Sequence, residues 1–144
     1  MIDPHCHSSS IEVAVAAQAA FAIMSDGIKQ GDWAWGSYQR RLVEPGLFVG
    51  TSLFDGKETW VRIDANAERL TVDYAVGRNP ETLQFRNASR VIPGALLGLD
   101  PAHSVVTLLT WRLATQTEQA WQQICATHEA EMFLIKGLLE RKAG

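Results

Sequence analysis

The most constraining feature of this chain is a helix-like segment near its end, residues 117–142, which follows a series of short alternating segments. One face of this segment is apolar apart from a single histidine. The residues on that face are Trp121, Ile124, Cys125, His128, Met132, Ile135 and Leu139. A long helix with one face to bury, placed after a run of strands, predicts a sheet that curls around it. A helix is only about 10 Å across, so one helix rarely fills the hollow of a curved sheet completely. The pattern therefore predicts a ligand cavity.

Composition narrows the class of protein. The 144 residues are enough for one domain with its own core. Basic and acidic residues are intermixed, with a formal net charge of −3 and no basic run, which argues against a nucleic-acid partner. No apolar stretch reaches the ~18 residues of a membrane span, and the first residues lack the features of a secretory signal. We therefore expect a cytoplasmic protein with no membrane span, in which Cys6 and Cys125 are reduced.

The order of elements follows from the change in hydrophobic period. Apolar alternation starts at Ile11, so we predict a flexible leader over residues 1–9 and one domain over residues 10–143. Two short helical pieces follow within residues 17–36, where Asp26 and Gly27 separate them. Six further strands are predicted over residues 38–44, 48–54, 58–64, 69–76, 84–92 and 104–113. A tight hairpin turn is expected at Asp55 and Gly56.

This layout resembles the START-like superfamily, also called SRPBCC. The resemblance is densest from Ile11 through Ala20-Phe21 and Ser25-Asp26 to Trp33, and it extends over residues 10–142. It implies an α+β helix-grip fold, with a curved antiparallel sheet of about seven strands wrapped around a long C-terminal helix. Ala17 stands where members often have proline. The superfamily has no universal catalytic set, so the resemblance implies a cavity and no particular chemistry. The rival fold is an NTF2-like cone, which tends to begin with its long helices.

Strand alternation predicts which side chains face the helix. In the last strand the more apolar face carries Val105, Thr107, Leu109, Trp111 and Leu113. In the strands before it, the predicted inward residues are Val61, Ile63, Leu70, Val72, Tyr74, Val76, Phe85, Asn87, Ser89 and Val91. A bulge would invert the assignment for part of a strand.

Candidate ligand-binding residues follow from these faces. The polar candidates inside the hollow are Tyr74, Asn87, Ser89, Thr107 and His128, because a few polar groups in an apolar hollow orient a small ligand. The larger candidates are Trp33 and Trp35 at the mouth, with Trp111, Trp121 and Met132 on the walls. The alternative for each is a purely structural role with a neighbour or a buried water as partner. On the outer face, Trp60 is compatible with a homodimer contact.

His128 is the candidate catalytic residue. An imidazole in the middle of the buried helix face can act as a general acid or base near neutral pH. Glu131 lies one turn further on, but no carboxylate is obviously placed to orient the ring. A single buried histidine is also compatible with a structural role.

The start of the chain offers possible metal ligands in Asp3, His5, Cys6 and His7. The pattern is similar to the opening of metal-dependent amidohydrolase barrels, but such a barrel needs about 250 residues. We therefore expect no metal site and no cofactor.

Three functions remain open. The first is binding of a small hydrophobic or aromatic molecule, lipid-like or polyketide-like, between the sheet and the last helix. The second is an enzyme similar to polyketide cyclases and dehydratases, with His128 as general acid or base. The third is a co-chaperone-like interaction domain that uses the outer sheet surface. The absence of an obvious acid and base pair favours the first.

Overall fold

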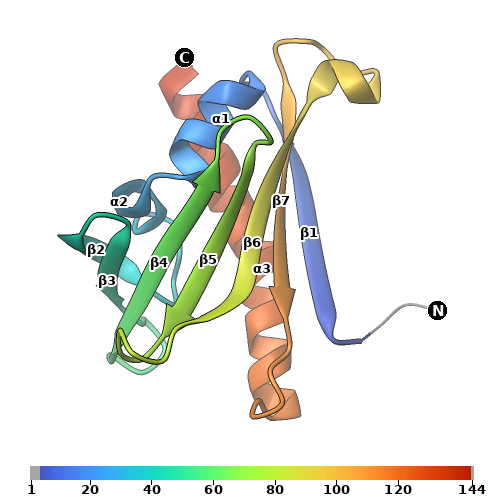
Figure 1. Ribbon diagram of the computed structural model, residues 1–144. Helices are drawn as coiled ribbons and strands as arrows, with labels where there is room; N and C mark the ends of the chain where they lie inside the picture. The colour runs from blue at the N-terminus through green and yellow to red at the C-terminus, as the bar shows by residue number, and fades with distance from the viewer. Residues whose placement is uncertain (1–3, 144) are drawn as a thin grey trace.

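The computed structural model describes residues 4–143 and contains a curved antiparallel sheet with one long helix across its concave face (Figure 1). The elements, in chain order, are β1 (Cys6–Val13), α1 (Ala17–Met24), α2 (Gly27–Gln30), β2 (Tyr38–Glu44), β3 (Leu47–Thr51), β4 (Glu58–Asn66), β5 (Thr71–Gly77), β6 (Gln84–Pro93), the 3-10 helix η1 (Gly94–Leu97), β7 (Ser104–Trp111) and α3 (Glu118–Ala143). This arrangement confirms the predicted α+β helix-grip fold with two short helices after the first strand and a long C-terminal helix.

The sheet brings the first and last strands together. Its seven strands are hydrogen-bonded in the order β1-β7-β6-β5-β4-β3-β2. β1 pairs with β7, with Cys6 opposite Trp111 and Val13 opposite Ser104. The two short helices carry the chain from this edge of the sheet to β2 at the other edge (Figure 1). Since α3 follows β7 directly, the long helix starts beside the β1 edge.

The first strand begins earlier than the sequence suggested. β1 starts at Cys6, four residues before the predicted boundary at Ser10, so residues 6–9 belong to the sheet. Backbone pairing with β7 holds this polar stretch, and hydrophobic alternation therefore did not reveal it. Residues 1–3 of the predicted leader, Asp3 included, lie outside the described residues. Over residues 4–143, no three His, Cys, Asp or Glu side chains gather into a possible metal site.

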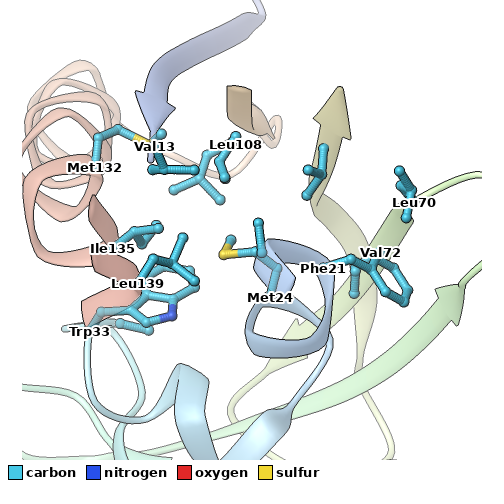
Figure 2. Close-up of a cluster of buried hydrophobic side chains, with 14 of the residues drawn as sticks. Val13, Phe21, Met24, Trp33, Leu70, Val72, Leu108, Met132, Ile135 and Leu139 are labelled. Atoms are coloured by element: carbon cyan, nitrogen blue, oxygen red, sulfur yellow. The ribbon is translucent and has the colours of Figure 1, made fainter. Parts of the chain in front are cut away.

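One end of the space between α3 and the sheet is filled by a packed hydrophobic core. Met132, Ile135 and Leu139 of α3 face Met24 of α1 and Val13 of β1 (Figure 2). The inward residues predicted for β4 and β5 join this core or pack against it, namely Val61, Ile63, Leu70, Val72, Tyr74 and Val76. Packing against the sheet and α1 thus buries the apolar face of α3.

No helix in the described part of the chain is long and apolar enough to cross a membrane.

The predicted inner face of β7 is wrong. The buried side chains are Ser104, Val106, Leu108 and Thr110. Val105, Thr107 and Leu109 alternate with these and are half-buried, and Trp111 is exposed. The prediction chose the more apolar face, but a small polar side chain can be buried when it finds a partner. Ser104 does so, because its Oγ donates a hydrogen bond to the Val15 carbonyl at 2.9 Å.

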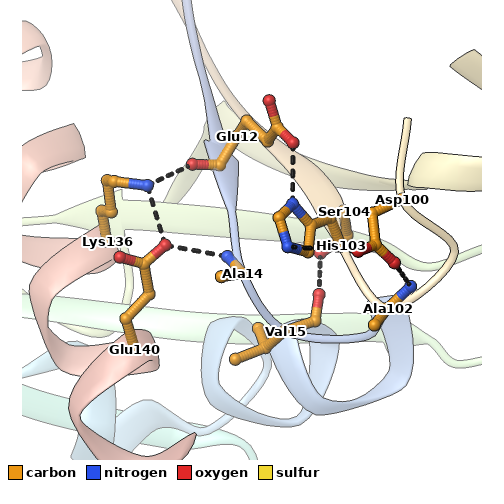
Figure 3. Close-up of polar contacts among 9 residues, drawn as sticks. All are labelled: Glu12, Ala14, Val15, Asp100, Ala102, His103, Ser104, Lys136 and Glu140. Carbon is orange, nitrogen blue, oxygen red and sulfur yellow. Dashed lines mark hydrogen bonds and ion pairs between the residues drawn. The ribbon is translucent and has the colours of Figure 1, made fainter. Parts of the chain in front are cut away.

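A polar cluster ties the C-terminal half of α3 to β1 (Figure 3). Lys136 Nζ donates to the Glu12 carbonyl at 2.9 Å and to Glu140 Oε2 at 2.7 Å. The same Glu140 oxygen accepts the Ala14 N–H at 2.8 Å, and the Glu12 carboxylate contacts His103 Nδ1 at 2.8 Å. Because these side chains are partly exposed to solvent, each bond contributes modestly to stability. Together they fix the direction of α3 across the sheet.

Ile135→Ala should destabilise the protein by about 2–5 kcal/mol, because the fully buried side chain leaves a cavity in the core. The matched control is Phe133→Ala on the same helix, where the side chain is 72% exposed and the loss should stay within about 0.5 kcal/mol. Urea denaturation of both variants measures the difference. Equal losses would mean that α3 does not present this face to the sheet.

Candidate functional site

A cavity of about 770 Å³ occupies the other end of the space between α3 and the sheet. It is lined by α3 from Ala120 to Glu131, by the inner faces of β4, β5, β6 and β7, and by the segment between α2 and β2. The β5–β6 connection and the start of α3 lie at this end, which is the lower end in Figure 1. The volume is in the range of small-molecule sites in proteins.

The lining is more polar than the hydrophobic cavity that the sequence predicted. Trp33, Val61, Leu108 and Ile124 form apolar walls. Five charged side chains, besides His128, also line the cavity: Arg40, Asp55, Arg78, Arg86 and Glu131. A ligand in this space therefore meets both apolar surface and charged groups.

A β-bulge in β6 places one of these charges. Tyr74 pairs with Asn87 and Ala75 pairs with Phe85, so Arg86 is an extra residue in β6. This irregularity inverts the predicted faces before the bulge. Phe85, predicted to face inward, is 62% exposed, and Arg86 lines the cavity instead. Asn87 lines the cavity as predicted.

A buried arginine, Arg40, lines the cavity together with Gln30 and Ser37. Arg40 Nε donates to the Ser37 carbonyl at 3.0 Å, and its Nη1 donates to Gln30 Oε1. A tight approach of the backbone makes this possible, since a Cβ on Gly31 would lie 2.7 Å from the Arg40 nitrogen. Burial lowers the pKa of Arg40 to about 10, so the guanidinium stays charged at neutral pH.

Glu131 of α3 also lines the cavity and is almost fully buried. Its Oε2 accepts the backbone N–H of Trp35 at 2.8 Å, which fixes the loop that lines the cavity. Burial raises the pKa of this carboxyl group to about 8, and the Trp35 N–H and the charge of Arg40 offset only part of that effect. The carboxyl group is therefore largely protonated at pH 7. In the sequence, Glu131 lies one turn after His128, next to the predicted buried face. It was not among the predicted site residues because a charged side chain was not expected there.

His128 has the opposite shift. Burial lowers its pKa to about 4, with further contributions from the positive charges of His7 and Arg86. Its Nδ1 is buried and has no hydrogen-bond partner among residues 4–143. The imidazole is therefore neutral at pH 7, and Glu131 is a neutral acid one helical turn away. Pairs of groups whose pKa values are pushed apart are a recurring basis of acid–base chemistry.

Tyr74 lines the cavity, but its hydroxyl group is already used. It donates to the Met24 carbonyl at 2.7 Å and lies 2.8 Å from Ser89 Oγ. Burial raises the pKa of the phenol, so it remains protonated. Tyr74 and Ser89 therefore satisfy each other and tie β5 and β6 to α1.

The remaining predicted site residues divide into two groups. Trp33 lines the cavity, and its Nε1 is buried and unpartnered among the described residues. Trp35 contributes its backbone N–H to Glu131. Trp35 itself and the others lie outside the lining. Trp121 and Met132 are buried elsewhere on α3, Thr107 contacts Ser10 at 2.7 Å, and Trp111 is on the outer face.

An ion pair lies at the mouth of the cavity. Arg78 Nη2 is 2.7 Å from Asp55 Oδ2, and its Nη1 donates to Thr59 Oγ1 at 3.1 Å. This contact joins the β3–β4 turn to the β5–β6 turn. Phe54 beside it is half exposed and lines the opening. Arg78 is therefore already neutralised by a protein carboxylate.

Several solved structures are similar to this chain over nearly its whole length. A START superfamily protein from Mycobacterium smegmatis is 16% identical, with a TM-score of 0.72 over 95% of this chain and 98% of that one. The Zhui aromatase/cyclase from Streptomyces sp. R1128 is 14% identical, with a TM-score of 0.69 over 96% and 95%. The protein Ara h 8.0201 is 16% identical, with a TM-score of 0.61 over 95% and 98%. No family model and no curated protein sequence matches the chain.

Glu131→Gln should change how stability depends on pH. The folded state raises the pKa of Glu131 from its ordinary value of 4.5 to about 8. The carboxyl group then contributes stability that is fully present below about pH 4.5 and is lost as the pH rises through 8. Each unit of pKa difference corresponds to about 1.4 kcal/mol. Glutamine keeps an acceptor for the Trp35 N–H and removes the titration.

The measurement is the difference in unfolding free energy between wild type and Glu131→Gln, from urea denaturation between pH 4.5 and 8.5. The stability of wild type relative to the variant should fall across this window. His128 is present in both proteins, so its own titration cancels to a first approximation. A difference that does not vary with pH would show that Glu131 is ionised normally in the folded protein.

Proposed function

We propose that this chain, which has the START-like (SRPBCC) helix-grip fold predicted from its sequence, binds a small aromatic molecule between α3 and the concave face of the sheet. The observation that carries the proposal is the cavity of about 770 Å³, which combines apolar walls with polar atoms that have no partner among the described residues. A few convergent polar groups in an otherwise apolar cavity are typical of small-molecule sites.

The chemistry of the lining favours an oxygenated aromatic ligand over a plain acyl chain. Trp33 and Val61 offer apolar surface, and burial of apolar area contributes about 25 cal/mol per Å². Asn87, Arg86 and His128 favour polar groups on the ligand, because their buried atoms lack partners and are stabilised only by a hydrogen bond. Among the similar solved structures, the one described as an aromatase/cyclase supports an aromatic ligand.

A tryptophan in the lining should abolish binding. Ala120 lines the cavity on α3, so Ala120→Trp places a large side chain in the space that the ligand needs. Ala126→Trp is the matched control, because Ala126 is exposed on the same helix and does not line the cavity. We expect two-ring and three-ring aromatic acids and phenols to raise the melting temperature of wild type and of Ala126→Trp. The melting temperature of Ala120→Trp should not change when they are added.

Thermal shift measures this directly, since a ligand that binds only the folded state stabilises it by about 2.7 kcal/mol at a hundred times its Kd. A panel of fatty acids of increasing length serves as the comparison class. Stabilisation by fatty acids alone would contradict the aromatic assignment. Equal shifts in Ala120→Trp and Ala126→Trp would place the ligand outside the cavity.

A second function is favoured by one specific observation, the opposite pKa shifts of His128 and Glu131 on one face of α3. In this candidate the neutral His128 Nδ1 takes a proton from the carbon next to a ligand carbonyl. The protonated Glu131 donates its proton to the carbonyl oxygen, so that an enol forms and both residues are left ready for the reverse transfer. Such proton transfers underlie cyclisation and dehydration of carbonyl compounds, and no cofactor is needed.

Proton exchange on an aromatic ketone tests this second function. In D₂O, wild type should accelerate deuterium incorporation at the carbon next to the carbonyl of 1-tetralone, as followed by NMR. His128→Gln and Glu131→Gln should each lower the accelerated rate by roughly 100-fold or more, the usual contribution of one general acid or base. Binding of 1-tetralone without faster exchange would leave binding as the only function. Unchanged rates in both variants would exclude these two residues.

A further inference from the structure

Arg86 is a charged side chain that the fold delivers to the cavity and leaves without a protein partner. The bulge in β6 turns it inward, and it lines the cavity. Its Nε is buried and unpartnered, and within residues 4–143 the guanidinium makes no hydrogen bond or ion pair. Burial lowers its pKa, with no contribution from a carboxylate.

The other buried or cavity-lining arginines are satisfied by the protein. Arg40 is held by Ser37 and Gln30, and Arg78 is paired with Asp55. Burying part of a charged group without a partner costs free energy. Arg86 is therefore the cavity-lining arginine with a buried nitrogen that no other residue in the range 4–143 satisfies.

The surroundings of Arg86 add to this argument. Its charge contributes to the lowered pKa of His128, which places the two side chains within electrostatic range. Asn87 Oδ1 and His128 Nδ1 are both buried and lack partners among the residues described. The carboxyl groups of the lining do not neutralise Arg86, because Asp55 is paired with Arg78 and Glu131 is largely protonated at pH 7. This wall of the cavity therefore carries a net positive charge.

We propose that Arg86 anchors a carboxylate on the ligand, so that the cavity selects aromatic carboxylic acids over neutral aromatic molecules of the same shape. This inference rests on the proposed binding function and names its ligand class. A planar guanidinium matches the two oxygens of a carboxylate, and such charge-assisted hydrogen bonds are about twice as strong as neutral ones. Asn87 Oδ1 accepts a hydrogen bond from a hydroxyl group beside the carboxylate, which favours hydroxylated aromatic acids further.

The test compares two probes that differ in charge and hardly in shape, 2-naphthoate and 2-naphthamide, by titration calorimetry at pH 7.5. Wild type should bind the naphthoate roughly tenfold to a hundredfold more tightly than the amide. In Arg86→Gln the ratio should fall to one or below, while affinity for the amide changes little. Arg86→Lys keeps the charge without the fork and should retain part of the preference.

Arg90→Gln is the matched control, because Arg90 is an exposed arginine on the same strand and its loss changes the net charge equally. It should keep the full preference for the carboxylate. An equal loss in Arg90→Gln would overturn the anchor, since the preference would then reflect overall charge. Equal binding of both probes to wild type would overturn the anchor and leave the proposed function intact. Binding of neither probe, nor of any other aromatic compound, would overturn both proposals.

Discussion

The packing of the C-terminal half of α3 against the sheet and α1 positions the cavity-lining residues that α3 carries. Met132, Ile135 and Leu139 are buried there, and the polar cluster around Lys136 and Glu140 fixes the helix against β1. A helix is rigid over its length, so anchoring one half also positions the other half. His128 and Glu131 belong to that other half, where the sheet curves away and a cavity remains. The core thus holds α3 in place, and some of its residues, such as Trp33 and Val61, also form walls of the cavity.

The cavity is lined by ionisable side chains that a purely structural protein interior would avoid burying. His128 and Glu131 are both shifted toward their neutral forms, and the shifts run in opposite directions because burial disfavours whichever form is charged. The arginines cannot respond in this way, since their pKa values remain far above neutral even after burial. A positive charge beside two neutral titratable groups is therefore the expected state at pH 7. Such an interior destabilises the empty protein, and it is the electrostatic basis for the proposed binding of an anion.

The sequence was sufficient for the fold and for the helix face, and insufficient for the details of the sheet. The period of 3.6 in α3 and the period of two in β4 and β5 identified the buried residues there. The rule that the more apolar face turns inward failed in β7, because Ser104 is buried with a backbone partner that no local pattern reveals. Sequence reasoning also omitted Glu131 from the site. The spacing of Glu131 from His128 placed it on the buried helix face, but its charge argued against burial. Trp111 and Thr107 were assigned to the wrong face for the same reason as the rest of β7.

A single extra residue in β6 decides the chemical character of the cavity. With regular alternation back from Asn87, Phe85 would face α3 and Arg86 would face solvent, giving the hydrophobic hollow expected from the sequence. The register shift opposite Tyr74 and Ala75 exchanges these two side chains. The exchange exposes a phenyl ring and partly buries a guanidinium, both of which are unfavourable for the isolated domain. A local distortion that costs stability twice and leaves an arginine facing a cavity is best accounted for by a ligand that carries the opposite charge.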